Sequence, residues 1–221
     1  AVDGDDSTLR LSSYNGDGAH EDDNFPDLVV DNTNAKQKYL LQSLGEMIGL
    51  KEMNGRLYIV KPTELEVCDL QSGLQDNLKV DCVARRGILS TRSGLFLPGR
   101  SGINLIPADG GGAVIANPNW KNRYDGTERT TAGTASRVTD ANRLGIIAGY
   151  NPVYQEEWFY LPTADADGTA RNLCYRRTKD GKWFCRLVGM GSTNVVSFFV
   201  AGTDNSFSIG FGHSAADVAP N

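Results

Sequence analysis

Two neighbouring carboxylates beside an indole are the residues of this chain whose types suggest acid–base chemistry. They are Glu156 and Glu157, followed by Trp158. A glycosidase needs two carboxyl groups about 5–9 Å apart and aromatic rings on which a sugar stacks. Adjacent residues of a strand point to opposite faces, so these glutamates do not form such a couple by themselves. Carbohydrate binding or glycan cleavage is therefore an alternative function, for which other carboxylates must complete the pair.

A second candidate is an acidic turn that resembles the opening of a calcium loop. Asp165, Asp167 and Gly168 follow the spacing of that loop, which also needs an oxygen ligand at the fifth position and a carboxylate near the twelfth. Those positions hold Thr169 and Arg176. The arginine favours a tight turn instead, in which Asp side chains bond to the backbone and Gly takes a positive φ.

The other residues suited to metal binding or catalysis are few. The two histidines, His20 and His213, are too few for a multi-histidine metal centre, and no Gly-x-Ser-x-Gly motif supports a Ser–His–Asp triad. An acidic cluster near the start is typical of a solvated loop, with cation binding as the alternative. Its members are Asp3, Asp5, Asp6, Asp22 and Asp23. We assign no catalytic, cofactor or metal residue and expect a protein that is not an enzyme.

The four cysteines, Cys68, Cys82, Cys174 and Cys185, contain no CxxC pair, which argues against a zinc site. Their even number permits two disulfides, with Cys174 and Cys185 meeting across a hairpin and Cys68 and Cys82 on neighbouring strands. Four buried thiols are favoured, because no signal peptide accompanies them.

The charge of the chain argues against a grip on nucleic acid. Its net charge is −5, from 22 basic and 27 acidic residues. DNA binding usually needs a basic face, whereas an acidic wall repels phosphate and lets DNA slide past. Basic residues cluster at Arg85-Arg86 and at Arg176-Arg177 with Lys179, where a solvated strand face or turn is favoured over a phosphate site. No apolar run reaches the length of a membrane span.

A short sequence pattern recurs along the chain: a strand-like run of aliphatic and aromatic residues is followed by a turn with Gly, Pro, Asp or Asn. Its anchors are Leu9, Leu57, Leu95, Trp158 and Phe207, which lie roughly 50 residues apart on average. This period is typical of four-stranded propeller blades. We predict an all-β fold, a propeller or partial propeller of about five blade-like antiparallel units, with a β-sandwich as the alternative. Six aromatic residues are expected to pack in its core or at sheet edges: Tyr58, Trp158, Tyr160, Tyr175, Trp183 and Phe184.

The sequence divides into an acidic strand and loop segment over 1–34 and a single all-β domain over 35–221. A short helix competes with strand over 36–48, and Asn54-Gly55 predicts a tight hairpin. The stretch 107–135 is predicted to be a loose insertion or partner contact, anchored by Trp120. Four antiparallel strands in succession are predicted between residues 144 and 184.

Several of these segments resemble a family of structural proteins from tailed bacteriophages, the tail nozzle or tail hub proteins. The hairpin from Ile48 to Val60, the segment from Cys82 to Ile103 and the stretch from Tyr150 to Val188 carry this resemblance. Within the last stretch, Glu157-Trp158-Phe159-Tyr160-Leu161-Pro162 precedes Gly181-Lys182-Trp183, as in the strand and hairpin of a blade in that group. Known nozzle proteins are much longer, so we expect a fragment, an isolated domain or a compact relative.

The resemblance implies a distorted propeller that assembles as a ring around the DNA exit channel. It implies copies of the chain itself and other tail or connector proteins as partners, with DNA passing nearby without specific binding. The protein would be made in the host cytoplasm and reside in the virion. The family brings no catalytic residues and no cofactor.

Overall fold

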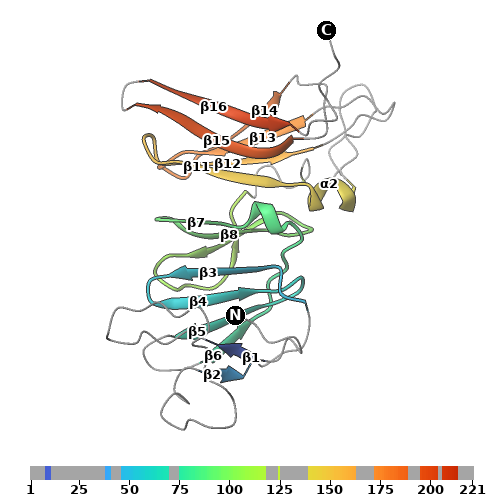
Figure 1. Ribbon diagram of the computed structural model, residues 1–221, viewed down its shortest axis with the longest axis vertical. Coiled ribbons are helices and arrows are strands. Elements are labelled where there is room, and N and C mark those ends of the chain that lie inside the picture. The colour runs from blue at the N-terminus through green and yellow to red at the C-terminus, as the bar shows by residue number, and fades with distance from the viewer. Residues whose placement is uncertain are drawn as a thin grey trace, which may run out of the picture.

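The protein is built mostly of antiparallel β-sheets with little helix, as a computed structural model shows (Figure 1). The structure describes residues 8–10, 38–40, 46–69, 75–117, 124, 139–162, 172–188, 195–203 and 206–213. The predicted all-β class is therefore confirmed. No helix in these ranges has the length and apolar character that crossing a membrane requires.

The first four-stranded sheet is an antiparallel meander. Its strands are β3 (Gly49–Met53), β4 (Arg56–Val60), β5 (Leu65–Asp69) and β6 (Gln75–Leu78). Asn54 and Gly55 form the first turn, with φ values of 54° and 75°. Two positive φ angles suit the right-handed twist of the flanking strands, and Asn and Gly adopt them readily. The predicted hairpin is confirmed.

The second four-stranded sheet follows the short 3-10 helix η2 (Arg85–Gly87). Its strands are β7 (Leu89–Thr91), β8 (Gly94–Pro98), β9 (Ile103–Pro107) and β10 (Val114–Ile115). All five residues of β8 are buried, as expected of a strand that is covered on both faces. This sheet is therefore the middle layer of the described structure.

The third four-stranded sheet follows helix α2 (Asp140–Leu144), which a capping box at Thr139 and Asn142 begins. Its strands are β11 (Ile147–Asn151), β12 (Glu156–Leu161), β13 (Asn172–Arg177) and β14 (Trp183–Val188). The four successive antiparallel strands predicted here are confirmed. The first begins at Ile147 rather than at Leu144, because Leu144 ends the helix.

Two two-stranded sheets complete the described elements. They consist of β1 (Thr8–Arg10) with β2 (Lys38–Leu40), and β15 (Val195–Thr203) with β16 (Ser206–His213). Four anchors of the sequence repeat fall in the second strand of a sheet, namely Leu57 in β4, Leu95 in β8, Trp158 in β12 and Phe207 in β16. The repeat therefore marks equivalent strands of successive sheets.

Two apolar cores lie on the two faces of the middle sheet. Leu95 and Leu97 belong to one core together with residues of β4 and β5, whereas Phe96 belongs to the other together with Phe159 and Tyr175. This division follows from the alternation of side chains along β8. The ring centroids of Phe96 and Phe159 are 5.6 Å apart. The middle sheet thus joins the first sheet to the third.

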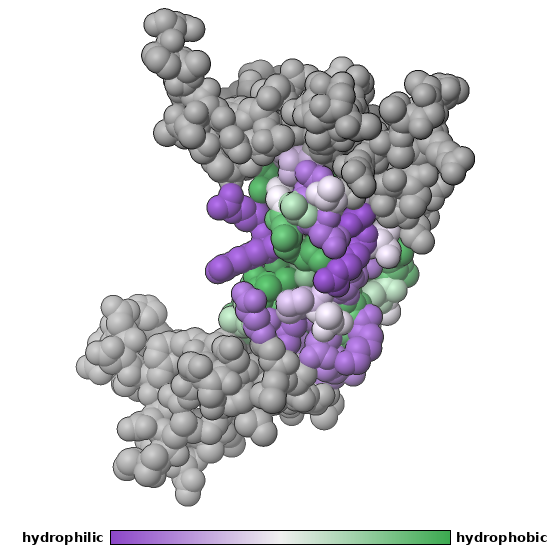
Figure 2. Space-filling model, turned by 90° about the vertical axis from the view of Figure 1, so that its right-hand side faces the viewer, coloured by the Kyte–Doolittle hydropathy of each residue, from purple (hydrophilic) through white to green (hydrophobic). Residues whose placement is uncertain are grey.

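The sheets follow one another along the long axis of the molecule (Figure 1). Their first strands lie closest together: β7 contacts β3 and β11, and β11 contacts β15. Figure 2 shows a hollowed surface near the middle of the molecule, where hydrophobic residues lie between hydrophilic ones. The later strands of each sheet therefore lie further from the neighbouring sheets than the first strands do.

Two features of the sequence prediction need correction. The helix considered for 36–48 is wrong at residues 38–40, which form β2 and pair with β1, whereas residues 36–37 and 41–45 lie outside the described residues. Within 107–135, Val114–Ile115 forms β10, and the Tyr124 side chain is fully buried and donates a hydrogen bond to the Gly99 carbonyl at 2.8 Å. At least these parts of the expected loose insertion are integrated into the sheet and the core. Trp120 lies outside the described residues.

Candidate binding groove

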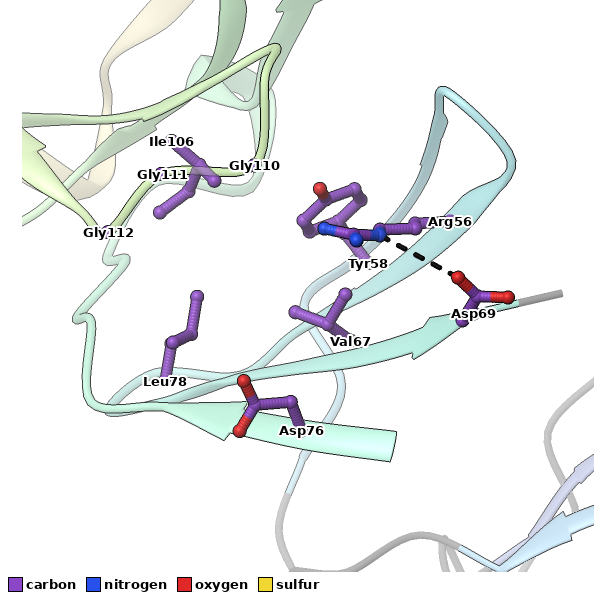
Figure 3. A pocket seen from close by; sticks show the side chains of 10 residues that line it. All are labelled: Arg56, Tyr58, Val67, Asp69, Asp76, Leu78, Ile106, Gly110, Gly111 and Gly112. Atoms are coloured by element: carbon purple, nitrogen blue, oxygen red, sulfur yellow. Dashed lines mark ion pairs between the residues drawn. The ribbon is translucent and has the colours of Figure 1, made fainter. Parts of the chain in front are cut away.

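A groove of about 410 Å³ lies between the first sheet and the loop that follows β9 (Figure 3). The first sheet contributes residues of β4, β5 and β6, and the loop contributes three consecutive glycines. The lining consists of Arg56, Tyr58, Val67, Asp69, Asp76, Leu78, Ile106, Gly110, Gly111 and Gly112. The groove thus joins segments that lie far apart in the sequence.

The glycine loop fits closely over an arginine. Gly110 has a φ of +86°, and a Cβ atom there would lie 2.7 Å from an Nη atom of Arg56. Its amide donates to the Pro107 carbonyl at 3.0 Å, and the Asn54 side-chain amide donates to the Ala108 carbonyl at 2.7 Å. The β3–β4 hairpin therefore holds the loop in place, and glycine at position 110 permits the close approach.

The groove has a polar rim and an apolar floor. Arg56 Nε and Asp69 Oδ2 are 3.9 Å apart, and these side chains are 45% and 34% exposed. Asp76 is also exposed, whereas Tyr58, Val67 and Ile106 are buried beneath. An ion pair this exposed contributes little to stability. An apolar floor with a few polar groups at the rim is typical of small-molecule sites.

A buried ion pair lies in the same sheet as the groove. Lys61 Nζ and Glu66 Oε1 are 2.9 Å apart, and both side chains are at most 3% exposed. Removing one partner of such a pair leaves a buried charge without compensation, which is strongly destabilising.

Three buried cysteines, Cys68, Cys82 and Cys174, form no disulfide, which agrees with the preference for thiols. Burial, and secondarily the charge of Glu66, raises the pKa of Cys68 to about 11. Burial is also the main cause that raises the pKa of Cys82 to about 12. Cys174 is opposite Arg186 in the β13–β14 register and not opposite Cys185. Protonated, buried thiols such as Cys68 and Cys82 are poor nucleophiles at neutral pH.

The two glutamates considered for glycoside chemistry have separate partners. Glu157 is 1% exposed and accepts hydrogen bonds from Arg177 at 3.1 Å and from Thr91 at 2.9 Å. Glu156 accepts a hydrogen bond from the Trp158 indole at 3.2 Å. The inference that they do not act as one couple is supported, because Glu157 instead connects the third sheet to the middle sheet.

The arginines of the pair at 176–177 occupy different environments. Arg176 lies between the rings of Trp158 and Phe184, with its guanidinium carbon 5.6 Å and 4.8 Å from their centroids. Arg177 is only 15% exposed, and one of its Nη atoms donates to both Ser93 Oγ and Glu157. The expectation of a solvated face is wrong for Arg177. The same expectation agrees with the structure for Arg85 and Arg86, which are exposed in η2.

The six aromatic residues divide by depth. Tyr58, Tyr160 and Tyr175 are buried, Trp158 and Trp183 are half-buried, and Phe184 is 47% exposed. The core expectation is thus confirmed for the tyrosines. Burial also raises the pKa of Tyr160 above its usual range.

The remaining sequence candidates are not brought together by the structure. The acidic turn at 165–168, the acidic cluster and His20 lie outside the described residues, and His213 ends β16. Within the described ranges, no three residues of the usual metal-ligating types converge. Sequence reasoning missed the groove, although the triple glycine after Asp109 signalled a close backbone approach.

Comparison with protein-family models and with curated proteins gave no match for this chain.

Proposed function

We propose that the chain is a non-enzymatic structural subunit of a phage tail or connector, of the nozzle or hub type. It assembles with copies of itself and with other tail or connector proteins around the DNA channel. The observation that carries this proposal is the serial stacking of antiparallel sheets through their first strands. We infer that the five sheets formed by the described residues are blade-like units of a partial propeller.

Several features support a scaffolding role. Strand β8 of the middle sheet is buried throughout, and Glu157 and Arg177 of the third sheet bond to Thr91 and Ser93, which lie in β7 and in the turn after it. A rigid core with variable loops suits a subunit that forms several contacts. The net charge of −5 suits a wall past which DNA slides, because like charges repel.

Mass and shape in solution test this proposal. We expect light scattering after size exclusion to give a discrete oligomer, and negative-stain electron microscopy to show a central opening. A monomer at every concentration would contradict the proposal.

A carbohydrate-binding module is the second candidate, and the groove favours it. Asp76 and the Arg56–Asp69 pair place hydrogen-bonding groups above an apolar floor, as sugar hydroxyls and a sugar face require. A glycan array with the purified chain would detect such binding. Asp76→Asn should lower it, whereas Asp180→Asn, in an exposed turn that does not line the groove, should not.

A further inference from the structure

The outermost strands of the sheets differ in length and charge. The last strands of the three four-stranded sheets are β6, β10 and β14. β6 has four residues and contains Asp76, β10 has two residues, and β14 contains Arg186. Short or charged edge strands resist pairing with a second chain, since natural sheets use these devices to prevent association.

The strand β16 has neither device. It is eight residues long, Ser206–His213, and it contains no Lys, Arg, Asp, Glu or Pro. Among the described strands it pairs with β15 alone, in a sheet of two strands. A long, uncharged edge is a template for another strand, because its outward backbone groups need hydrogen-bond partners.

We propose that β16 pairs antiparallel with β16 of a second copy of this chain. The result is a four-stranded sheet in the order β15-β16-β16-β15, the same size as the other three larger sheets. This inference rests on the proposed function in one respect, which is that the chain assembles with copies of itself. It adds the element that makes one of the contacts between copies, the one that joins them in pairs.

A strand of a second copy is a better partner for β16 than β1 or β2 at the other end of the same molecule. β1 and β2 have three residues each, so they offer few backbone hydrogen bonds to an eight-residue strand. Figure 1 places them at the opposite end, with the three larger sheets between. Because packed sheets lie about 10 Å apart, that end is on the order of 40 Å away, far beyond the roughly 5 Å of strand pairing.

A two-fold axis through Ile209 gives the most favourable register. It pairs Ile209 with itself, Phe207 with Phe211 of the partner subunit and Ser208 with Gly210 of the partner subunit. Aromatic and β-branched cross-strand pairs stabilise a sheet, whereas an axis through Gly210 would pair two glycines at the centre. The contact is isologous, which means that the same strand edge of both copies takes part. Each copy can therefore form this contact only once.

Charge substitutions at Ser208 test the pairing. In the proposed register the two copies of residue 208 are diagonal neighbours, about 7–8 Å apart and within reach of long side chains. We expect Ser208→Lys and Ser208→Glu each to weaken the self-association, raising the dissociation constant about fivefold or more. An equimolar mixture of the two variants should restore association, because opposite charges then face each other.

Gln75→Lys provides the matched control, since it adds the same charge to the outermost strand of another sheet. Light scattering across a dilution series measures all four proteins. Wild-type-like association of both Ser208 variants would overturn this inference and leave the proposed assembly intact. Variants that remain dissociated in the mixture would also overturn the pairing. A wild-type chain that is monomeric throughout would overturn both this inference and the proposed function.

Discussion

The two interfaces that cover the middle sheet are built differently. Between the first and middle sheets the core is mainly aliphatic, with Leu65, Leu95 and Leu97 fully buried beside Tyr58. Between the middle and third sheets, aromatic rings accompany a buried network in which Glu157 binds Arg177 and Thr91. Aliphatic packing is non-directional, whereas hydrogen bonds fix geometry. We infer that the second interface sets the relative position of two sheets and the first supplies mainly cohesion.

The largest effect is expected from removing the cation that pairs with Glu157 at the interface between the middle and third sheets. Arg177→Met leaves Glu157 buried without its cation, and we expect the free energy of unfolding in urea to fall by about 4 kcal/mol. The double variant with Glu157→Gln should recover a large part of that loss, because no buried charge is then left unpaired. A loss below about 1 kcal/mol for the single variant would show that the network does not fix this interface.

A cavity at the first interface gives the matched measurement. Leu97 is fully buried, and Leu97→Ala is expected to lower the free energy of unfolding by about 3 kcal/mol. If the contrast between the interfaces holds, Leu97→Met should cost less than about 1.5 kcal/mol, since aliphatic cores accept swaps of similar volume. A larger loss would mean that shape is as strictly specified here as at the polar network.

A smaller effect is expected at the rim of the first interface. Gly110→Ala forces a non-glycine residue to a φ of +86° and displaces the Arg56 guanidinium, at a cost of about 1–2 kcal/mol. Thermal unfolding monitored by circular dichroism measures it. Gly112→Ala is the control, because a Cβ atom there meets nothing within 4 Å. Equal losses in both variants would contradict the fit between loop and arginine.

The smallest effect at neutral pH concerns the thiols of the first sheet and of the segment after it. The folded-state pKa values of Cys68 and Cys82 are raised from 9.0 to about 11 and about 12. A raised pKa means that the folded chain holds these protons more tightly than the unfolded chain. Their contribution to stability is therefore fully present below pH 9 and is lost as the pH rises toward 11 and 12.

Mass spectrometry after iodoacetamide treatment at about pH 8, below the ordinary thiol pKa, should find Cys68 and Cys82 unmodified in the native protein and modified in urea. Rapid native modification would show that this part of the structure opens readily.

Local turn chemistry was the part of the fold that sequence predicted best. Asn54-Gly55 requires a tight hairpin, and the turns after Asn151 and at Asp180-Gly181 separate strands of the third sheet, because Pro, Asp and Gly interrupt the apolar runs there. Helical spacing misled over 36–48, where pairing of β2 with β1, more than 25 positions earlier, overrides the local pattern. Helix α2 escaped notice because five residues are too few to show a period.

The candidate sites depend on contacts that no local pattern encodes. Arg177 meets Ser93 because two sheets are stacked, and these residues are 84 positions apart in the chain. Gly110 meets Arg56 for the same reason, through the packing of one sheet against the loop of the next. The sequence identified these residues as a basic pair and a glycine run, and only the stacking of the sheets assigns them partners.

The middle sheet, with both faces covered, also determines how the molecule would come apart. Loss of an outer sheet exposes one face of the middle sheet, whereas loss of the middle sheet removes the support of both neighbours. In a stack where each unit contacts only those beside it, unfolding proceeds inward from the ends. Amide hydrogens of β8 should therefore exchange last, and a force applied along the stack would be borne longest by its centre.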